Sequence, residues 1–157
     1  MHIRPAVEGD IPALKSILRN SWLVTWAPEL AFETVQRFAA TDPAGQYAQG
    51  KWREFIVAED DGALLGMFHI EGDHLHAIHL DPRRKRRRIG SALMDDVERR
   101  IALNHRQATL EVRAFNIGAI AFYRQRGWLQ RGAAYPGTEC GEPCETLEMV
   151  KTLNGLE

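Results

Sequence analysis

The spacing of hydrophobic residues along the first third of this chain predicts a short strand followed by two helices. Apolar residues three and four positions apart indicate one helix that begins after Asp10 and another that ends near Asp42. Their apolar faces are Ile11, Leu14, Ile17 and Leu18 in the first helix, and Phe32, Val35, Phe38 and Ala39 in the second. His2–Pro5 is predicted as the strand, and Ser21–Leu30 as the loop between the helices.

Three strand-like segments then follow one another with tight turns between them. They are Glu54–Asp60, Ala63–Glu71 and His74–Asp81. Asp61-Gly62 is a strong hairpin signal, because glycine tolerates the positive φ angle of a tight turn, and Gly72-Asp73 supplies a second turn. The pattern therefore predicts an antiparallel meander.

The rest of the chain alternates between helical and strand patterns. The predicted elements are a helix over Arg88–Leu103, a strand over Thr109–Arg113, a helix over Ile117–Arg126, and closing strands over Trp128–Ala133 and Glu145–Thr152 around a Pro/Gly-rich loop. The first of these helices makes a crossover, so the strands on either side of it should run parallel. The predicted fold class is α/β, a mixed sheet with one parallel pair in its middle.

The composition is that of a globular protein. The 157 residues suit one domain over residues 1–157, and 45% hydrophobic and 26% charged residues argue against disorder. No apolar run approaches the ~18–20 residues of a membrane span, and the amino terminus does not resemble a signal peptide. We expect a cytoplasmic protein with no membrane contact, in which Cys140 and Cys144 are thiols.

Charge is unevenly distributed along the chain. Residues 83–88 are six consecutive basic residues, whereas the whole chain has 20 lysines and arginines against 21 acidic residues. A positive cluster on an otherwise acidic body indicates a polyanionic ligand at one place. An alternative is a module that binds nucleic acid or another anionic partner through this run. The short patch and the acidic remainder argue against it, so no nucleic acid is expected.

The basic run leads from a predicted strand into a predicted helix. Such a junction presents free backbone N–H groups and partial positive charge, and Gly90 in the first turn lets a phosphate approach closely. The residues there are Leu80-Asp81-Pro82-x-x-Lys85-x-x-Arg88-Ile89-Gly90-Ser91-Ala92, followed later by Leu110-Glu111-Val112-Arg113-x-x-Asn116-x-x-Ala119-x-x-Phe122-Tyr123-x-x-x-Gly127-Trp128. In this order, the two segments resemble the acetyl-CoA motifs of the GNAT family of N-acetyltransferases.

The resemblance implies a fold, a reaction and a location for the acceptor. The implied fold is a mostly antiparallel sheet with one splayed parallel strand pair and helices on both faces. The implied reaction moves an acetyl group from acetyl-CoA directly to a primary amine of a small molecule or a peptide. The acceptor should lie beside Ser21–Leu30 and the second helix. Its identity stays open, and a homodimer is compatible with the family.

The family pattern also assigns cofactor-binding positions. The backbone of Ile78, His79 and Leu80 should pair with the pantetheine arm, and Asn116 should bond the same arm. The pyrophosphate should meet the backbone amides of Arg86, Arg87, Arg88, Ile89, Gly90 and Ser91, with Lys85 at a position where the family has Arg or Gln. Arg88 stands where the family usually has its first glycine, and we expect binding to persist with a different loop path.

The reaction needs a proton donor for the departing thiolate and a proton acceptor for the amine. Tyr123 matches the tyrosine that faces the thioester sulfur in the family, which implies the donor role. For the proton acceptor, His74 and His76 are expected to share one strand face, with His79 on the other. The pair His74 and His76 resembles the paired histidines of arylalkylamine N-acetyltransferases. Glu111 matches the base of the ribosomal-protein alanine acetyltransferases, and a water chain is the third alternative.

A metal site was the remaining alternative for these histidines. His74, His76 and His79, together with Asp81, are ligand types that zinc accepts. Strand alternation should separate His79 from the other two and leave only two ligands on one face. No metal is therefore expected.

Overall fold

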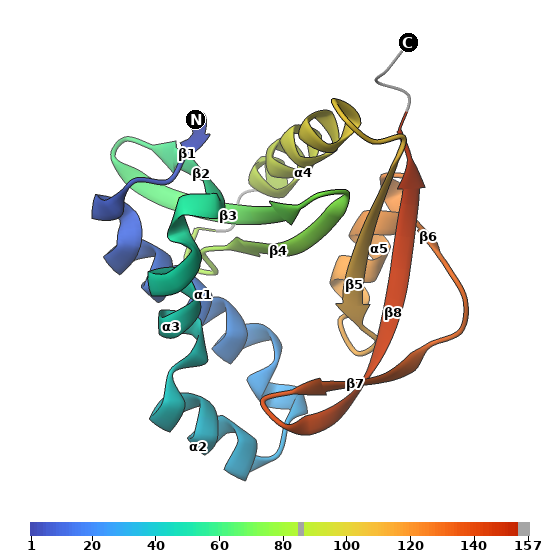
Figure 1. Cartoon of the computed structure of the whole chain (residues 1–157). Helices are drawn as coiled ribbons and strands as arrows, with labels where there is room; N and C mark the ends of the chain where they lie inside the picture. Colours follow the sequence, from blue (N-terminus) through green and yellow to red (C-terminus); the bar gives the residue numbers. More distant parts are fainter. Residues whose placement is uncertain (85–86, 154–157) are drawn as a thin grey trace.

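The computed structural model describes residues 1–84 and 87–153. Its eight-stranded sheet has the order β1-β2-β3-β4-β5-β8-β6, with β7 paired to β8 off this path. The strands are β1 (His2–Pro5), β2 (Phe55–Asp60), β3 (Ala63–Glu71), β4 (His74–Leu80), β5 (Gln107–Arg113), β6 (Leu129–Gln130), β7 (Tyr135–Glu139) and β8 (Glu142–Thr152). Among these described strands, β4 and β5 alone pair in parallel, which confirms the predicted fold class (Figure 1).

Three helices precede the meander, one more than predicted. They are α1 (Ile11–Thr25), α2 (Phe32–Thr41) and α3 (Pro43–Lys51). The predicted loop from Ser21 was wrong at its start, because α1 continues to Thr25. Asp42 ends α2 in a left-handed conformation and also accepts a hydrogen bond from the Gly45 N–H at 3.2 Å, so it caps α3.

The meander of β2, β3 and β4 is antiparallel, as predicted, but its last pairing is irregular. His69 lies opposite Ala77, whereas Ile70 lies opposite Leu75, so His76 is an extra residue in β4. Such a bulge breaks the strict alternation of side chains along a strand and turns some of them in new directions. The alternation expected for the histidines of β4 therefore fails at His76.

The carboxy-terminal half contains α4 (Arg87–Ala102), α5 (Ile117–Gln125) and four strands. The predicted strand over Trp128–Ala133 is only the two residues of β6. The segment predicted as a Pro/Gly-rich loop contains β7, and β8 begins at Glu142 rather than at Glu145. A turn at Cys140-Gly141, where φ is 50° and 84°, joins β7 to β8 into a hairpin.

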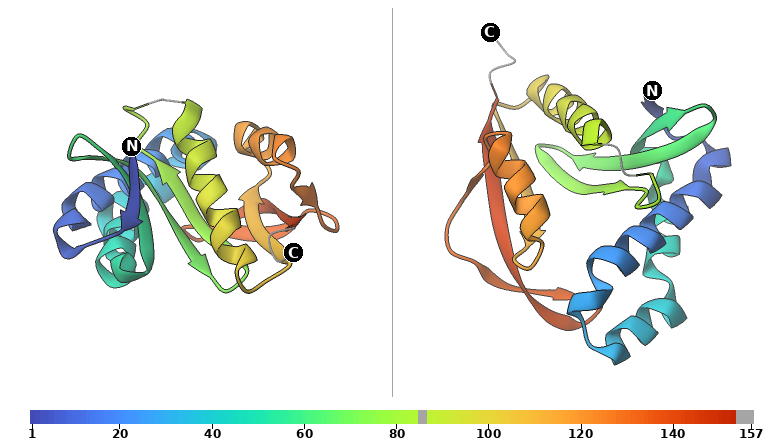
Figure 2. Two further views of the ribbon diagram at one scale, coloured as in Figure 1. Left: turned by 90° about the horizontal axis from the view of Figure 1, so that it is seen from above. Right: turned by 180° about the vertical axis from the view of Figure 1, so that it is seen from behind.

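Helices cover both faces of the sheet, as Figure 2 shows, and each face has its own hydrophobic cluster. One cluster joins α4 and α5 to the sheet and includes Leu93 and Trp128. The other joins α1 and α3 to the opposite face and includes Leu14 and Phe55. In the described part of the chain, no helix is both long and apolar enough to cross a membrane.

Candidate active site

The parallel strands β4 and β5 pair over a short length and then diverge. Its two registered pairs are His74 with Thr109 and Leu75 with Leu110. Beyond them, β4 continues to pair with β3 on one side only, and β5 pairs with β8 on one side only. The backbone groups of Ile78, His79 and Leu80 that face β5 are therefore free to pair with an extended ligand. This splay, visible in Figure 1, has the geometry that the sequence assigned to the pantetheine site.

The amino terminus of α4 lies next to the splay. A methyl group added at Gly90 would stand 3.6 Å from both Leu80 and Phe122, an ordinary contact, so packing within the protein does not require a glycine there. Ile89 is buried, Ser91 is half-buried, and the Arg88 side chain is exposed to solvent. The Arg88 side chain therefore does not occupy the space next to the backbone of the first turn of α4. Lys85, Arg86 and the side chain of Arg87 lie outside the described residues.

The basic run is partly neutralised by an acid at its start. Asp81, which is 2% exposed, accepts hydrogen bonds from the Arg83 backbone N–H at 3.0 Å and from the Arg83 guanidinium at 3.1 Å. Arg84 lies 3.7 Å from the same carboxylate. Burial raises the pKa of Asp81, but the bonds from Arg83 outweigh it and hold the pKa below its usual range. The charges of Arg83 and Arg84 are therefore engaged within the loop.

Tyr123 lies on α5, on the face of the sheet that α4 and α5 cover. Its ring is in the hydrophobic cluster, 8% exposed, with the Trp128 ring centroid 6.2 Å away. Burial raises the pKa of Tyr123 to about 12, so the hydroxyl holds its proton at neutral pH. The α5 helix is fixed at its start by Asn116, whose side chain accepts from the Ala119 N–H at 3.4 Å.

The histidines of β4 do not form the expected pair. The His74 Nδ1 is 2.8 Å from the Thr109 hydroxyl on β5, whereas the His76 ring packs edge-on against His69 of β3, with centroids 5.0 Å apart. His79 was expected on the other face, but it contacts α1, with its Nδ1 2.9 Å from the Ser21 hydroxyl. The bulge at His76 interrupts the alternation of side chains along β4, so the faces expected for His74, His76 and His79 are wrong. Burial lowers the pKa of His79 to about 4, so its ring is neutral.

Glu111 occupies the first position of β5 after the last residue paired with β4. Its side chain is exposed and lies beside Tyr135 of β7. Burial and then the Glu111 carboxylate raise the pKa of Tyr135. Glu111 and His76 are thus the first residues of β5 and β4 beyond the parallel pairing, but within the described residues the His76 ring contacts rings of β3 and α3.

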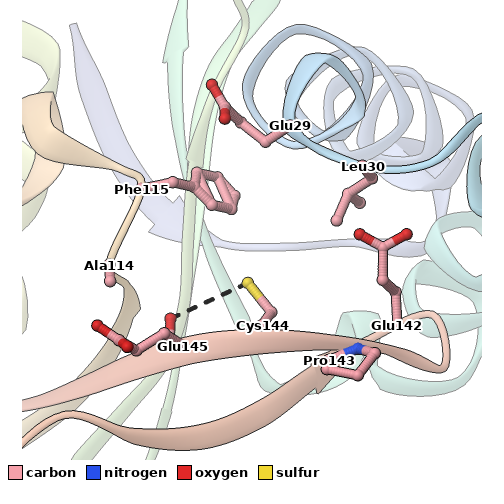
Figure 3. A pocket seen from close by; sticks show the side chains of 8 residues that line it. All are labelled: Glu29, Leu30, Ala114, Phe115, Glu142, Pro143, Cys144 and Glu145. Atoms are coloured by element: carbon pink, nitrogen blue, oxygen red, sulfur yellow. Dashed lines mark hydrogen bonds between the residues drawn. The ribbon is translucent and has the colours of Figure 1, made fainter.

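A pocket lies beside Ala114 and Phe115, directly after the carboxy-terminal end of β5 (Figure 3). Its volume is 440 Å³, and its walls come from the segment after α1, the end of β5 and the β7–β8 hairpin. The lining residues are Glu29, Leu30, Ala114, Phe115, Glu142, Pro143, Cys144 and Glu145. Three glutamates and several apolar residues therefore line one space, and the Glu142 carboxylate points toward Leu30 across it (Figure 3). The sequence indicated the segment before α2 as an acceptor wall, but the hairpin residues had no signal in the sequence.

Hydrogen bonds hold the hairpin against the helices. Glu139 accepts from the Trp22 indole N–H at 2.7 Å and lies 3.4 Å from the Arg113 guanidinium. The Glu142 carboxylate accepts from the Ala31 N–H at 2.9 Å and from the Thr34 hydroxyl at 2.8 Å, at the start of α2. The hairpin is therefore fixed to α1 and to the start of α2, and through Arg113 also to β5.

The comparisons with known proteins agree with this geometry. The profile of the acetyltransferase (GNAT) family matches residues 11–128. This chain belongs to the GNAT family. The acetyltransferase is 44% identical over 127 residues to the peptidyl-lysine N-acetyltransferase YiaC of Escherichia coli K12, a match that covers 80% of this chain and 82% of YiaC.

Solved structures show the same fold. A GCN5-related N-acetyltransferase from Rhodopseudomonas palustris matches this acetyltransferase with a TM-score of 0.81 at 20% identity, over 97% of this chain and 95% of the other. The PaiA N-acetyltransferase from Thermoplasma acidophilum, solved with coenzyme A, matches with a TM-score of 0.75 at 20% identity, over 96% and 98% of the two chains.

The family and the YiaC match confirm that the chain is an acetyl-CoA-dependent N-acetyltransferase. They give no support to the alternative of a nucleic-acid module.

Proposed function

We propose that this acetyltransferase modifies the side-chain amine of lysine in peptides or proteins, with residues 1–157 acting as one catalytic domain. The observation that carries the proposal is the pocket at the open end of the splay, which Glu29, Glu142 and Glu145 line together with apolar residues. A lysine side chain combines a cation with an aliphatic stem, so it matches both kinds of lining. The 44% identical relative YiaC is a peptidyl-lysine N-acetyltransferase, which supports the same acceptor class.

The described residues fit acetyl-CoA as the donor, which supplies an activated acetyl thioester. The free edge of β4 at Ile78, His79 and Leu80 can pair with the amides of the pantetheine arm. The backbone N–H groups of Arg87, Arg88 and Ile89 can hold the pyrophosphate, because the first N–H groups of a helix have no acceptor within it. Asn116 keeps its cap on α5, and its amide group remains the proposed contact to the pantetheine arm.

Two side chains move protons in the proposed reaction. A lysine amine has a pKa of about 10.4, so it must lose a proton before its lone pair can attack. That first proton passes to solvent water. As the new N–C bond then forms and the C–S bond breaks, Glu111 accepts the second proton, which nitrogen releases, and Tyr123 donates its hydroxyl proton to sulfur. Solvent then restores the proton of Tyr123 and removes the one held by Glu111.

The contacts favour Glu111 over the histidines as the proton acceptor. The Glu111 carboxylate is exposed on a strand edge that borders the splay. The His74 Nδ1 is engaged by Thr109, and the His76 ring is turned toward β3. The Glu111 side chain also has a hydrogen-bond partner, the Tyr135 hydroxyl, but it stays exposed beside the splay, where an incoming amine can reach it.

A matched set of peptides tests the acceptor class. The set has one sequence with a blocked amino terminus and a central lysine, the same sequence with arginine, and a lysine-free version with a free amino terminus. Mass spectrometry should detect acetyl-CoA-dependent acetylation of the lysine peptide alone. Acetylation of the free amino terminus, or of a polyamine but no peptide, would contradict the proposal.

The pocket can be tested separately with two glutamine variants. Glu29→Gln removes a carboxylate from the pocket, and Glu33→Gln removes an exposed carboxylate from α2 outside it. We expect Glu29→Gln to raise the KM for the lysine peptide about threefold, as for a partly exposed charge contact, with kcat unchanged. Equal KM values in both variants would contradict a role for this pocket.

A further inference from the structure

A buried histidine outside the proposed acetyl-transfer chemistry has one ring nitrogen without a hydrogen bond. His69 on β3 is 0% exposed, and its Nδ1 lies 2.5 Å from the Tyr47 hydroxyl of α3. Its Nε2 is also buried, and no described group makes a hydrogen bond with it. A buried polar atom without a partner costs about 1–3 kcal/mol, so its retention calls for an explanation.

Metal-ligand side chains surround this nitrogen. The Glu71 Oε1 lies 3.5 Å from the His69 Nε2, and the Glu54 Oε1 lies 3.7 Å from it. The His76 ring is edge-on to His69, and donor atoms of His69, Glu71 and His76 all lie within 4.8 Å of one another. The bulge in β4 places His76 in this group.

The distances of 3.5 and 3.7 Å from His69 Nε2 to the two carboxylates are too long for hydrogen-bonded ion pairs, and they leave this nitrogen unsatisfied. The Glu54 carboxylate is also paired with Lys51, whose Nζ lies 3.4 Å from its Oε2. When Nδ1 donates to the Tyr47 hydroxyl, the lone pair of Nε2 points at the carboxylates. Histidines that bind metals usually donate their other N–H in this way.

We propose that His69, Glu71 and His76 bind a divalent transition-metal ion of the zinc class, with Glu54 near enough to add a fourth ligand. Zinc takes imidazole nitrogen and carboxylate oxygen at about 2.0–2.2 Å, so ligand atoms around it stand about 3.3 Å apart. The group must close slightly to reach that spacing. The Glu71 side chain is 49% exposed and can supply this movement, whereas the Glu54 side chain, 46% exposed, must also leave Lys51.

This set of residues differs from the one that the sequence suggested. His74 and His79 belong to other contacts, and His69 joins only through the pairing of β3 with β4. The expectation that no metal would bind was drawn from the histidines of a single strand, so it did not consider this group. The proposal concerns a site separate from Tyr123 and Glu111, and it does not depend on the acceptor being lysine.

Metal titration of the tag-free, full chain tests the proposal. Cys140 and Cys144 are first changed to serine, because thiols bind zinc and cobalt elsewhere on the molecule. Visible absorption during Co²⁺ titration, followed by displacement with Zn²⁺ against a chelating dye, gives stoichiometry and affinity. We expect one ion per chain.

Variants at exposed positions then locate the ion without disturbing the core. His76→Gln and Glu71→Gln should each weaken Zn²⁺ binding at least tenfold, and each should abolish the rise in melting temperature caused by Zn²⁺. His2→Gln, an exposed strand histidine beside the amino terminus, is the control and should bind as before. No saturable binding, or binding that His76→Gln and Glu71→Gln leave unchanged, would overturn the proposal.

Discussion

Replacing Tyr123 with phenylalanine removes one hydroxyl group and leaves the packed ring in place. The residue is 8% exposed, and within the described residues its hydroxyl makes no hydrogen bond, so the substitution breaks none. The free energy of unfolding at pH 8 should therefore change by less than about 1 kcal/mol. A loss of activity in this variant cannot then be attributed to unfolding.

The expected loss of activity follows from the role of the hydroxyl. A positioned general acid contributes about 10²–10⁴-fold to a rate, so Tyr123→Phe should lower kcat about 100-fold, or ~2.7 kcal/mol in the barrier. The KM for acetyl-CoA should stay within about twofold, because the hydroxyl acts only as the C–S bond breaks. Steady-state kinetics with a thiol-detecting dye measures both quantities.

The raised pKa gives a second, independent measurement. The pKa of Tyr123 is about 12 in the folded protein against 10.0 for an ordinary tyrosine, so the folded state keeps the proton to higher pH. The stability from this group is full below pH 10 and falls as pH rises toward 12, by about 1.4 kcal/mol at pH 11. Urea unfolding at pH 8 and pH 11 should show this fall in the wild type, and Tyr123→Phe should show a smaller one.

Tyr47→Phe is the control for the kinetic measurement. It removes a tyrosine hydroxyl on the opposite face of the sheet, beside His69, and should leave kcat within about twofold. Turnover of Tyr123→Phe within twofold of the wild type would remove Tyr123 from the mechanism. Equal losses of stability between pH 8 and pH 11 in the Tyr123→Phe variant and the wild type would refute the argument from burial.

Three further substitutions test the proton acceptor, the hairpin and the phosphate turn. Glu111→Gln should lower kcat at least tenfold and remove the acidic limb of the pH–rate profile, whereas His76→Gln should retain that limb; the reverse result would assign the base to His76. Glu139→Gln weakens the bond from the Trp22 indole and should lower stability by about 1 kcal/mol in urea unfolding; no change would mean that this contact is not stabilising. Arg88→Gly should change the acetyl-CoA dissociation constant by less than about threefold in calorimetry, because the Arg88 side chain is exposed; tenfold tighter binding would show that the arginine obstructs the site.

The sequence predicted those parts of the fold that have a local period or a local turn signal. The meander and the crossover to β5 were correct because hydrophobic spacing and Asp61-Gly62 mark them directly. The α3 helix was missed because Pro43–Lys51 has no clear apolar stripe, and its start depends on the cap from Asp42. The β7 strand was missed because Pro136 and Gly137 are typical of loops, and only pairing with β8 makes them a strand.

The candidate site was predictable where it depends on motifs and unpredictable where it depends on pairing register. The splay of β4 and β5 and the helical turn at Gly90 lie where the motifs indicated, whereas the roles given to Gly90 and Tyr123 stay predictions. The bulge at His76 has no local sequence signal, yet it decides the directions of the β4 histidines. Glu142 reaches the pocket through a hairpin that the sequence did not predict.

The way the β7–β8 hairpin is attached gives the two ends of the site different resistance to local opening. Residues 135–145 contribute to neither hydrophobic cluster, and polar contacts such as Trp22 to Glu139 hold them to the helices. The strand edges at the splay are instead continuous with the packed centre of the sheet. Segments held by few apolar contacts open most readily, so amide hydrogens of the hairpin should exchange before those of β4 and β5. On warming, the β7–β8 hairpin beside the acceptor pocket would then unfold locally while the edges of β4 and β5 that bind acetyl-CoA remain folded.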